Sequence, residues 1–589
     1  MLQKPILLPI PKKMSFGDKC VANEVFSNEI TFESNSDLPS EGYLLVVNAE
    51  GIKITYADEA GKFYARQTLQ QLQMQYQNND CPILEIEDYP DIAIRGVSLD
   101  VSRDRIPPFE DLLKFVDLLA SWKINTFSLY FEHVFAYKNH EIFWKNASPF
   151  TAEDIKKLDN YCKERFIDLI PAQETLGHLA RILCHEPYRQ LAECPEGFSA
   201  MWQLRESDPF SLCPTDPKSL EFMEELLDEL LPNFSSEYFL CGGDETADIG
   251  IGRSKDICDK IGKDKVYADY FREISRIAKK HGKKIIIYAD MVKNNSTACN
   301  YLPKDIILAE WGYERNYPFA KNAKTFIDSD LRFFFLSSNN NFYTLGGRTY
   351  RWRGNIANAV KSAIELNALG VFNHEFGDFG HWTQFSFSLP GFAYGAAVSW
   401  NFKDNENMDI ASALDLFAYE KCENAADLIM DIGKIYLHTS ESNDADSLFY
   451  LFYRGMFGAE NVSKAELADR LAKAEEDLIS CTYRLQKLRN CPERVRQEIA
   501  AALQYISFAI HTAKELVQRD DVVKVCELPF EIQKDLTEEF CSVIDSLLKI
   551  RDKYYLIGGR HEAILYLKRY WETCFNQIKF PKKYLSDKL

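Results

Sequence analysis

Short apolar runs alternate with amphipathic stretches from residue 94 onward, and this alternation constrains the fold more than any other feature of the sequence. Eight runs have the character of strands: 94–102, 126–132, 167–174, 238–245, 284–290, 306–312, 332–340 and 370–378. Helical stretches separate most of them, among them 108–122, 154–165, 218–231 and 266–281. Continuous apolar runs are typical of parallel strands that helices cover. The pattern predicts an α/β fold with a (β/α)8, or TIM, barrel over residues 91–404.

Two regions with other patterns flank the barrel. Residues 1–90 predict a small α/β domain that supports the barrel, because no cluster of catalytic groups occurs in it. Its expected elements are strands at 43–47, 52–56 and 82–86 and a helix at 59–75. Residues 405–589 are almost wholly helical, with amphipathic stretches at 464–489, 492–519, 531–555 and 562–578. Such helices could form an antiparallel bundle or the surface of a homodimer.

The composition limits which classes of molecule the protein is expected to bind. A net charge of −19 argues against nucleic acid and anionic membranes, since both attract basic patches. No stretch reaches the roughly 20 apolar residues of a membrane span. The 15 cysteines form no C-x-x-C pair and the first residues lack a secretory pattern, so we expect reduced thiols in a cytoplasmic protein. With no His-x-x-x-His pair and no phosphate loop, neither a metal nor another cofactor is expected.

The predicted strand ends carry acids, amides, aromatic rings and one arginine. In a TIM barrel these ends form the active site. Aromatic rings support the apolar faces of sugars, and paired polar groups bind their hydroxyls, so a sugar pocket is expected. The candidates are Arg103, Glu132, His178, Asp244, Glu245, Tyr288, Asp290, Trp311, Tyr343, Phe376 and Asp378.

The stretch 238–245, Tyr-Phe-Leu-Cys-Gly-Gly-Asp-Glu, ends in two adjacent acids. Like charges in a confined site repel and raise one pKa, and a fold has no need of such a pair. A glycosidase does, because one carboxyl protonates the leaving oxygen while another negative group stabilises positive charge at the sugar. Taken alone, the two acids favour a solvated turn after a strand, and the other strand ends reverse that preference.

Each candidate also has a structural interpretation. Arg103 could pair with a barrel acid for stability, and His178 could be a satisfied buried histidine. Trp311 could belong to the core. Glu132 and Asp290 could be structural acids of the barrel mouth.

Together these residues resemble the family 20 glycoside hydrolases, the β-N-acetylhexosaminidases, from about residue 40 to 400. The stretches 51–54 and 58–72 look like the non-catalytic domain that precedes the barrel in that family. Arg95-Gly96 followed by 99–103 looks like its first barrel strand, and 242–245 looks like its catalytic signature. The resemblance implies an exo-acting enzyme that removes terminal β-linked N-acetylglucosamine or N-acetylgalactosamine from oligosaccharides or glycoconjugates.

The resemblance also implies substrate-assisted retaining catalysis, in which the substrate's 2-acetamido oxygen forms an oxazolinium ion. Glu245 would be the general acid and then the base. Asp244 would orient the acetamido N–H, and Tyr343 would bind the acetamido oxygen. Arg103 would hold the C3 and C4 hydroxyls, and His178 would set the environment of Glu245.

The implied pocket wall departs from the family pattern. Trp311 and Tyr288 would enclose the acetamido methyl group, and Asp378 would bind the C4 or C6 hydroxyl. Tyr288 and Phe376 stand where the family often has tryptophan. Trp382, just beyond, is a candidate for the missing wall.

Two other functions remain open at this point. A retaining barrel glycosidase with a protein nucleophile would need two acids on different strands about 5 Å apart, which the adjacent Asp244 and Glu245 suit less well. A sugar-binding protein on an inactive barrel would keep the fold without the chemistry. Retention of Asp244, Glu245, His178 and Arg103 argues against an inactive site.

Overall fold

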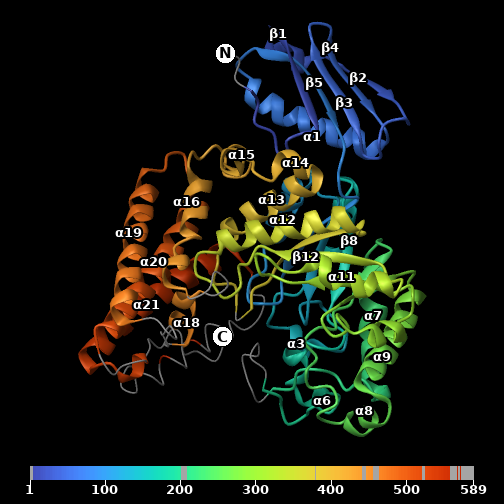
Figure 1. Ribbon diagram of the computed structural model, residues 1–589, viewed down its shortest axis with the longest axis vertical. Coiled ribbons are helices and arrows are strands. Elements are labelled where there is room, and N and C mark those ends of the chain that lie inside the picture. The colour runs from blue at the N-terminus through green and yellow to red at the C-terminus, as the bar shows by residue number, and fades with distance from the viewer. Residues whose placement is uncertain are drawn as a thin grey trace.

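The computed structural model describes residues 4–199, 208–378, 380–440, 446–454, 463–519 and 524–556, together with Leu567 and Trp571. Figure 1 shows a small sheet domain at one end, a central barrel, and a group of helices beside the barrel. The helix expected at 562–578 lies outside the described residues, apart from those two positions. Among the described helices, none has the length and apolar character needed to cross a membrane.

The small domain is a five-stranded sheet covered by one helix. The sheet order is β1-β5-β3-β4-β2, and all neighbouring pairs are antiparallel except β2 and β4. Asp58 begins the helix by accepting a hydrogen bond from the N–H of Gly61. The elements are β1 (Lys13–Val21), β2 (Ile30–Ser34), β3 (Tyr43–Asn48), β4 (Gly51–Tyr56), α1 (Glu59–Tyr76) and β5 (Cys81–Asp88). Sequence analysis missed β1 and β2.

The barrel is closed by eight parallel strands, which confirms the predicted fold class. Its order is β10-β11-β12-β13-β6-β7-β8-β9, so the last strand pairs with the first. The strands are β6 (Ile94–Asp100), β7 (Thr126–Phe131), β8 (Asp168–Gln173), β9 (Tyr238–Leu240), β10 (Lys284–Tyr288), β11 (Ile307–Trp311), β12 (Phe333–Ser338) and β13 (Gly370–Glu375). Side chains such as Ile170, Ile286 and Phe334 fill its interior.

Helices surround the barrel and explain why its strands are apolar on both faces. The longer ones are α2 (Phe109–Ser121), α4 (Ala152–Lys163), α7 (Pro217–Leu230), α9 (Lys263–Lys280), α11 (Phe319–Asp328), α12 (Thr349–Leu366) and α13 (Leu389–Trp400). The shorter ones are α3 (Glu141–Trp144), α5 (Ala180–Leu183), α6 (Glu186–Arg189), α8 (Lys255–Ile261) and α10 (Ser296–Tyr301).

The small domain packs against the end of the barrel where the strands begin. Glu41 forms an ion pair with Arg95 at 2.7 Å, beside the start of β6. Asp88 pairs with the buried Lys123 at 2.7 Å and accepts a hydrogen bond from Trp400 Nε1 at 2.8 Å. The small domain therefore does not cover the opposite end of the barrel, where the strands finish.

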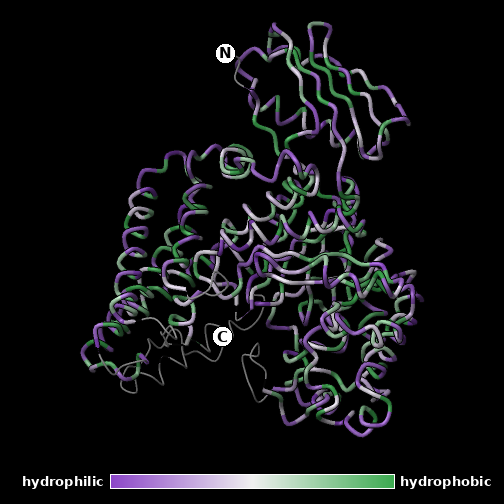
Figure 2. The backbone as a smooth tube through the Cα atoms, in the orientation of Figure 1, coloured by the Kyte–Doolittle hydropathy of each residue, from purple (hydrophilic) through white to green (hydrophobic). Residues whose placement is uncertain are grey.

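The C-terminal helices pack on the barrel rather than standing apart from it. They are α14 (Phe402–Asn405), α15 (Ile410–Phe417), α16 (Ala425–Ile432), α17 (Tyr436–Thr439), α18 (Ser447–Arg454), α19 (Lys464–Lys487), α20 (Glu493–Val517) and α21 (Phe530–Tyr554). Buried Glu498 of α20 accepts a hydrogen bond from the backbone N–H of Ser386 at 2.9 Å. Arg494 pairs with Asp111 of α2 at 2.7 Å. Figure 2 shows hydrophobic and hydrophilic residues alternating along α19 and α20, as amphipathic helices require.

Candidate active site

The carboxyl ends of the eight parallel strands meet at one mouth of the barrel, where the sequence predicts the site. Eleven of the twelve predicted residues occur at these ends or just past them. They are Arg103, Glu132, His178, Asp244, Glu245, Tyr288, Asp290, Trp311, Tyr343, Phe376 and Asp378. The twelfth, Trp382, has a different position, described below.

Two glycines bring the acid pair into the mouth. Strand β9 ends at Leu240, earlier than predicted, because Gly242 and Gly243 have φ angles of 73° and 97°. A Cβ atom at Gly242 would lie 1.9 Å from Glu174 Oε2, so only glycine fits there. The turned backbone delivers Asp244 and Glu245 to the mouth instead of continuing along the barrel wall.

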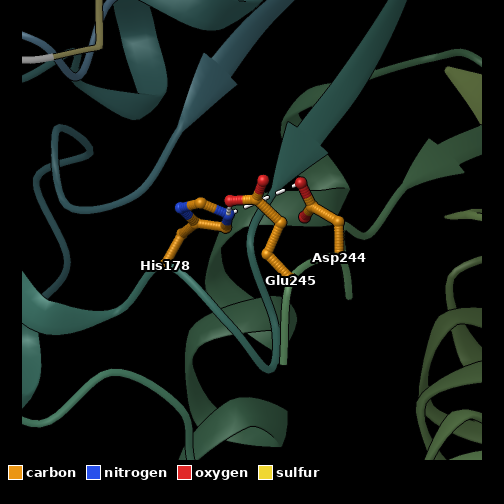
Figure 3. Close-up of side chains that lie close together, drawn as sticks. All are labelled: His178, Asp244 and Glu245. Atoms are coloured by element: carbon orange, nitrogen blue, oxygen red, sulfur yellow. Dashed lines mark ion pairs between the residues drawn. The ribbon is translucent and has the colours of Figure 1, made fainter. Parts of the chain in front are cut away.

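His178 lies between the two acids, and Figure 3 shows its ring pointing to both carboxylates. Its Nε2 atom is 3.4 Å from Asp244 Oδ2 and 3.4 Å from Glu245 Oε2. Burial alone would lower the pKa of His178, but the negative charges of Asp244 and Glu245 raise it well above the ordinary value. The Nε2 side of the His178 ring therefore links the two carboxylates.

The backbone at this cluster is itself unusual. His178 and Glu245 have φ angles of 55° and 54°, a region that residues with a Cβ rarely adopt. Such conformations persist where the surrounding structure enforces them, and they concentrate at functional sites. The ligand atoms of His178, Asp244 and Glu245 also approach closely enough, within 4.8 Å, to hold a metal ion. A metal ion there would need His178 Nε2 without a proton, since only an unprotonated ring nitrogen binds metals.

Arg103 has the ion pairs that its structural interpretation anticipated, yet it also reaches the cluster. Its guanidinium is 3.0 Å from Asp100 Oδ2 and 2.9 Å from Glu132 Oε1. The same Nη2 atom lies 3.5 Å from Nδ1 of His178. The guanidinium also packs 4.7 Å above the ring of Tyr130. These partners hold the planar donor group rigidly beside the acids.

Asp290 holds the backbone of Glu245. Its Oδ2 atom accepts a hydrogen bond from the Glu245 N–H at 2.9 Å, and its Oδ1 lies 3.4 Å from Nε1 of Trp311. Burial and the charge of Asp244 raise the pKa of Asp290 to about 7. Asp290, at the end of the fifth strand, thus connects Trp311 of the sixth strand with Glu245, which follows the glycine turn.

Comparisons with known proteins now decide the family. The model "Glycosyl hydrolase family 20, catalytic domain" matches residues 131–352, and "Glycosyl hydrolase family 20, domain 2" matches residues 7–89. Together the two matches cover more than half of the chain. The chain belongs to glycosyl hydrolase family 20. The resemblance seen in the sequence is confirmed.

Curated relatives carry the names of glycosidases. The chain is 28% identical to "Beta-hexosaminidase" of Porphyromonas gingivalis over 314 residues, which are 48% of this chain and 39% of that protein. It is 26% identical to "Lacto-N-biosidase" of Bifidobacterium bifidum over 299 residues, which are 47% of this chain and 24% of that protein. The chain therefore spans less than half the length of these relatives.

Solved structures share the fold. The chitobiase of Flavobacterium johnsoniae superposes with a TM-score of 0.57 at 18% identity, over 92% of this chain and 98% of that chain. The family 20 exo β-N-acetylglucosaminidase of Vibrio harveyi, in complex with N-acetylglucosamine, gives a TM-score of 0.57 at 18% identity over 70% and 75%. At such identities the likeness concerns the fold.

Aromatic rings line the mouth of this family 20 barrel. Trp311 stacks on Tyr313, with ring centres 5.2 Å apart and planes 24° apart. Tyr313 contacts Phe376 at 6.1 Å, and Phe376 contacts Tyr130 at 5.5 Å. Sequence analysis missed Tyr313 because it follows the expected sixth strand, although its place two residues after Trp311 was a usable signal.

Tyr288 lies deeper than a wall residue. It is buried, and burial together with the charge of Asp244 raises the pKa of its phenol well above the ordinary value. Among the described residues, no group hydrogen-bonds to the Tyr288 hydroxyl or to Asp244 Oδ1, although both atoms are buried. Two buried polar atoms without protein partners suit a polar group of a ligand.

Tyr343 and Asp378 come from the last two strand ends and face the acid cluster. Burial and then the charges of Asp378 and Glu245 raise the pKa of Tyr343 well above the ordinary value. The pKa of Asp378 is raised to about 6 by burial, which outweighs the opposing charge of Arg103, while Glu245 adds to the rise. All these groups are therefore within electrostatic reach of one another.

Trp382 packs against the helical region, and its predicted place in the pocket wall stays a prediction. Its side chain is buried in the core against Phe452 and Tyr453 of α18, at ring distances of 5.4 and 6.2 Å. The guanidinium of Arg551 lies 5.8 Å from its ring. The Trp382 side chain points toward α18, and its contacts with that helix anchor the helical region to the barrel.

Glu174, at the end of the third strand, was not among the predicted site residues. This buried acid accepts a hydrogen bond from the N–H of Gly243 at 3.3 Å, beneath the acid pair. Burial and then the charge of Asp244 raise the pKa of Glu174 well above the ordinary value. Its place at a strand end was the one signal that could have identified it.

Proposed function

We propose that this protein is an exo-acting β-N-acetylhexosaminidase. It removes terminal, non-reducing β-linked N-acetylglucosamine or N-acetylgalactosamine from oligosaccharides or glycoconjugates, by substrate-assisted retaining catalysis. The observation that carries the proposal is the acid pair of a family 20 barrel gathered around His178, with the buried Asp244 Oδ1 left without a protein partner. Relatives named beta-hexosaminidase support the substrate class.

Glu245 transfers the protons of the reaction. As an acid it gives a proton to the glycosidic oxygen while the substrate's 2-acetamido oxygen attacks the anomeric carbon and the leaving group departs. The oxazolinium ion that forms is then opened by water, whose proton returns to Glu245. The side chain of Glu245 is 26% exposed, more than that of Asp244, which suits exchange with solvent and the aglycone.

Asp244 prepares the acetamido group for this attack. Its free Oδ1 accepts the acetamido N–H, and its charge stabilises the developing positive charge of the oxazolinium ring. Tyr343 donates its hydroxyl to the acetamido oxygen. Asp290 fixes the Glu245 backbone, and His178 holds both carboxylates in place by charge.

The remaining groups bind the sugar ring. Arg103 offers donors to the C3 and C4 hydroxyls, beside Glu132. Asp378 takes the C4 or C6 hydroxyl. Trp311 and Tyr288 enclose the acetamido methyl group, with Tyr313 and Phe376 extending the wall.

Several broader expectations stand beside this proposal. We place the divisions between the three parts near residues 90 and 404. A homodimer through the C-terminal helices and a cytoplasmic location stay predictions. Light scattering of the full chain tests the former.

Hydrolysis assays test the function. We expect turnover of p-nitrophenyl β-N-acetylglucosaminide or β-N-acetylgalactosaminide, inhibition by a thiazoline mimic of the oxazolinium ion, and no turnover of the plain β-glucoside or β-galactoside. Efficient turnover of the plain sugars would contradict substrate assistance and favour a protein nucleophile. Thiazoline binding without any turnover would favour a sugar-binding protein on an inactive barrel.

A further inference from the structure

The loop between β12 and α12 carries Tyr343 in a conformation that needs support. Residues 339–348 are almost all buried, and Tyr343 has a φ angle of 51°. A tyrosine in this left-handed region costs free energy and stays there only when its surroundings enforce it. Some of the enforcing contacts lie within the loop, such as the hydrogen bond from Arg348 Nη2 to the Phe342 carbonyl at 2.8 Å, and others come from the C-terminal helices.

Asp446 connects this loop to α18. Its Oδ1 atom accepts hydrogen bonds from the N–H groups of Leu448 and Phe449, at 3.1 and 3.2 Å, in the first turn of the helix. Its Oδ2 atom accepts one from the Thr344 hydroxyl at 2.8 Å and lies 3.4 Å from the N–H of Leu345. One buried carboxylate thus caps α18 and holds the two residues that follow Tyr343.

Three helices close around the same loop. The rings of Phe449 and Tyr450 in α18 lie 6.0 and 6.2 Å from the ring of Tyr343. A Cβ atom at Gly346 would lie 2.7 Å from Ile432 of α16 and 3.1 Å from Ile506 of α20. The loop is therefore packed tightly against all three helices.

We propose that Asp446 is a positioning residue of the active site: by holding Thr344 and Leu345 against α18, it fixes Tyr343 where the substrate's acetamido oxygen binds. The helical region is then a working part of sugar recognition. This inference rests on the proposed function, because it takes Tyr343 as the group that binds the acetamide.

Variants of the full chain test the inference. Thr344→Val removes the hydroxyl while keeping the side-chain shape, Thr344→Ser restores it, and Asp446→Asn weakens the acceptor. Asp409→Asn is the matched control, because Asp409 caps α15 by accepting from the N–H groups of Ala411 and Ser412, and no hydrogen bond among the described residues joins it to the Tyr343 loop. The readouts are kcat and KM for p-nitrophenyl β-N-acetylglucosaminide, thiazoline affinity, melting temperature, and hydrogen exchange of residues 340–348.

We expect Thr344→Val and Asp446→Asn to weaken thiazoline binding and lower kcat by about tenfold or more, as loss of a buried hydrogen bond predicts. Exchange of residues 340–348 should become faster in both variants. Thr344→Ser should regain most of the affinity. Asp409→Asn should lower only the melting temperature.

Two results would overturn the inference. One is wild-type thiazoline affinity in Thr344→Val, which remains decisive even if Asp446→Asn does not fold. The other is an equal loss of affinity in Asp409→Asn. If the wild-type protein neither turns over N-acetyl sugars nor binds the thiazoline, the proposed function fails. Hydrogen exchange then still judges the role of Asp446, because unchanged exchange of the loop in Thr344→Val contradicts it.

Discussion

At the scale of single residues, the pKa of Asp290 responds to the charge of its neighbour Asp244. Burial and the charge of Asp244 raise its pKa from the ordinary value of 3.8 to about 7. The folded protein therefore holds this proton more tightly than the unfolded chain does. Stability associated with it is complete at low pH and is lost as the pH rises through about 7.

Asp290→Asn removes this ionisation while its amide oxygen can still accept the Glu245 N–H. We expect the melting temperature of the variant, relative to wild type, to rise from about pH 4 to pH 7 and then to level off. Thermal melts of both proteins from pH 4 to pH 8 measure the difference, in which the other titrating groups largely cancel. A difference that does not change with pH would show that Asp290 is ionised throughout.

Glu245→Gln tests the proton-transfer role directly. Loss of the general acid and base should lower kcat/KM by about 10²- to 10⁴-fold, the usual contribution of such a group. Thiazoline binding and the melting temperature should stay close to wild type, because the amide keeps the size of the side chain. Steady-state kinetics and calorimetry give both numbers. Undiminished turnover would assign proton transfer to another residue.

The site residues that could be predicted are those whose chemistry and strand-end position coincide, such as Asp244, Glu245 and Arg103. Trp382 could not be placed, because its direction depends on α18, far along the chain. Glu174 was passed over because a single acid at a strand end has no distinctive pattern. Its significance comes from contact with Gly243, which sequence does not show.

At the scale of elements, β9 and its glycine turn determine where the acids emerge. The sequence predicted a strand through residue 245, but the structure ends it at Leu240. Periodicity cannot reveal such a break, because a positive φ at Gly242 leaves the apolar pattern unchanged. The strands β1 and β2 were missed because their side chains are mostly exposed or half-buried, so their alternating apolar residues, Met14 and Phe16 or Ile30 and Phe32, form no continuous apolar run.

Gly242→Ala should disrupt the site and destabilise the fold. The new methyl group would meet Glu174 Oε2 at 1.9 Å, so we expect a loss of about 2 kcal/mol or more of unfolding free energy together with most of the activity. Gly282→Ala is a matched control, because Gly282 has a φ angle of 70° but no atom within 4 Å of the added Cβ. Urea unfolding separates two contributions to the loss of unfolding free energy: backbone strain, which both variants share, and the clash with Glu174, which only Gly242→Ala has. Equal losses would show that the Glu174 contact is unimportant.

At the scale of the whole molecule, the small domain and the barrel share a buried charged junction. Asp88 accepts hydrogen bonds from Lys123, Tyr43 and Trp400, and Lys123 is as deeply buried as Asp88. Domain order was readable from composition and periodicity. The packing between domains could not be predicted, because the sequence of an amphipathic helix or of a single lysine does not show which residues it contacts.

Lys123→Met should leave the Asp88 carboxylate buried without its cation. Breaking one side of such a pair costs about 3–5 kcal/mol, which urea unfolding would detect. Lys13→Met is the control: its pair with Glu87 at 2.8 Å is exposed, so its removal should change stability little. Thiazoline affinity of folded Lys123→Met should equal that of wild type, since the junction lies at the far end of the barrel. Equal stability of the two variants would contradict a structural role for the buried pair.

The position of the small domain has a practical consequence. Because it covers the end of the barrel where strands begin, its outer sheet faces away from the mouth, and Cys20 on β1 is exposed there. A linker attached at Cys20, in a variant that lacks Cys574 and the exposed Cys526, would fix the protein to a bead or sensor chip with its mouth open to the liquid. Such a surface would present every molecule in one orientation to large glycoconjugates.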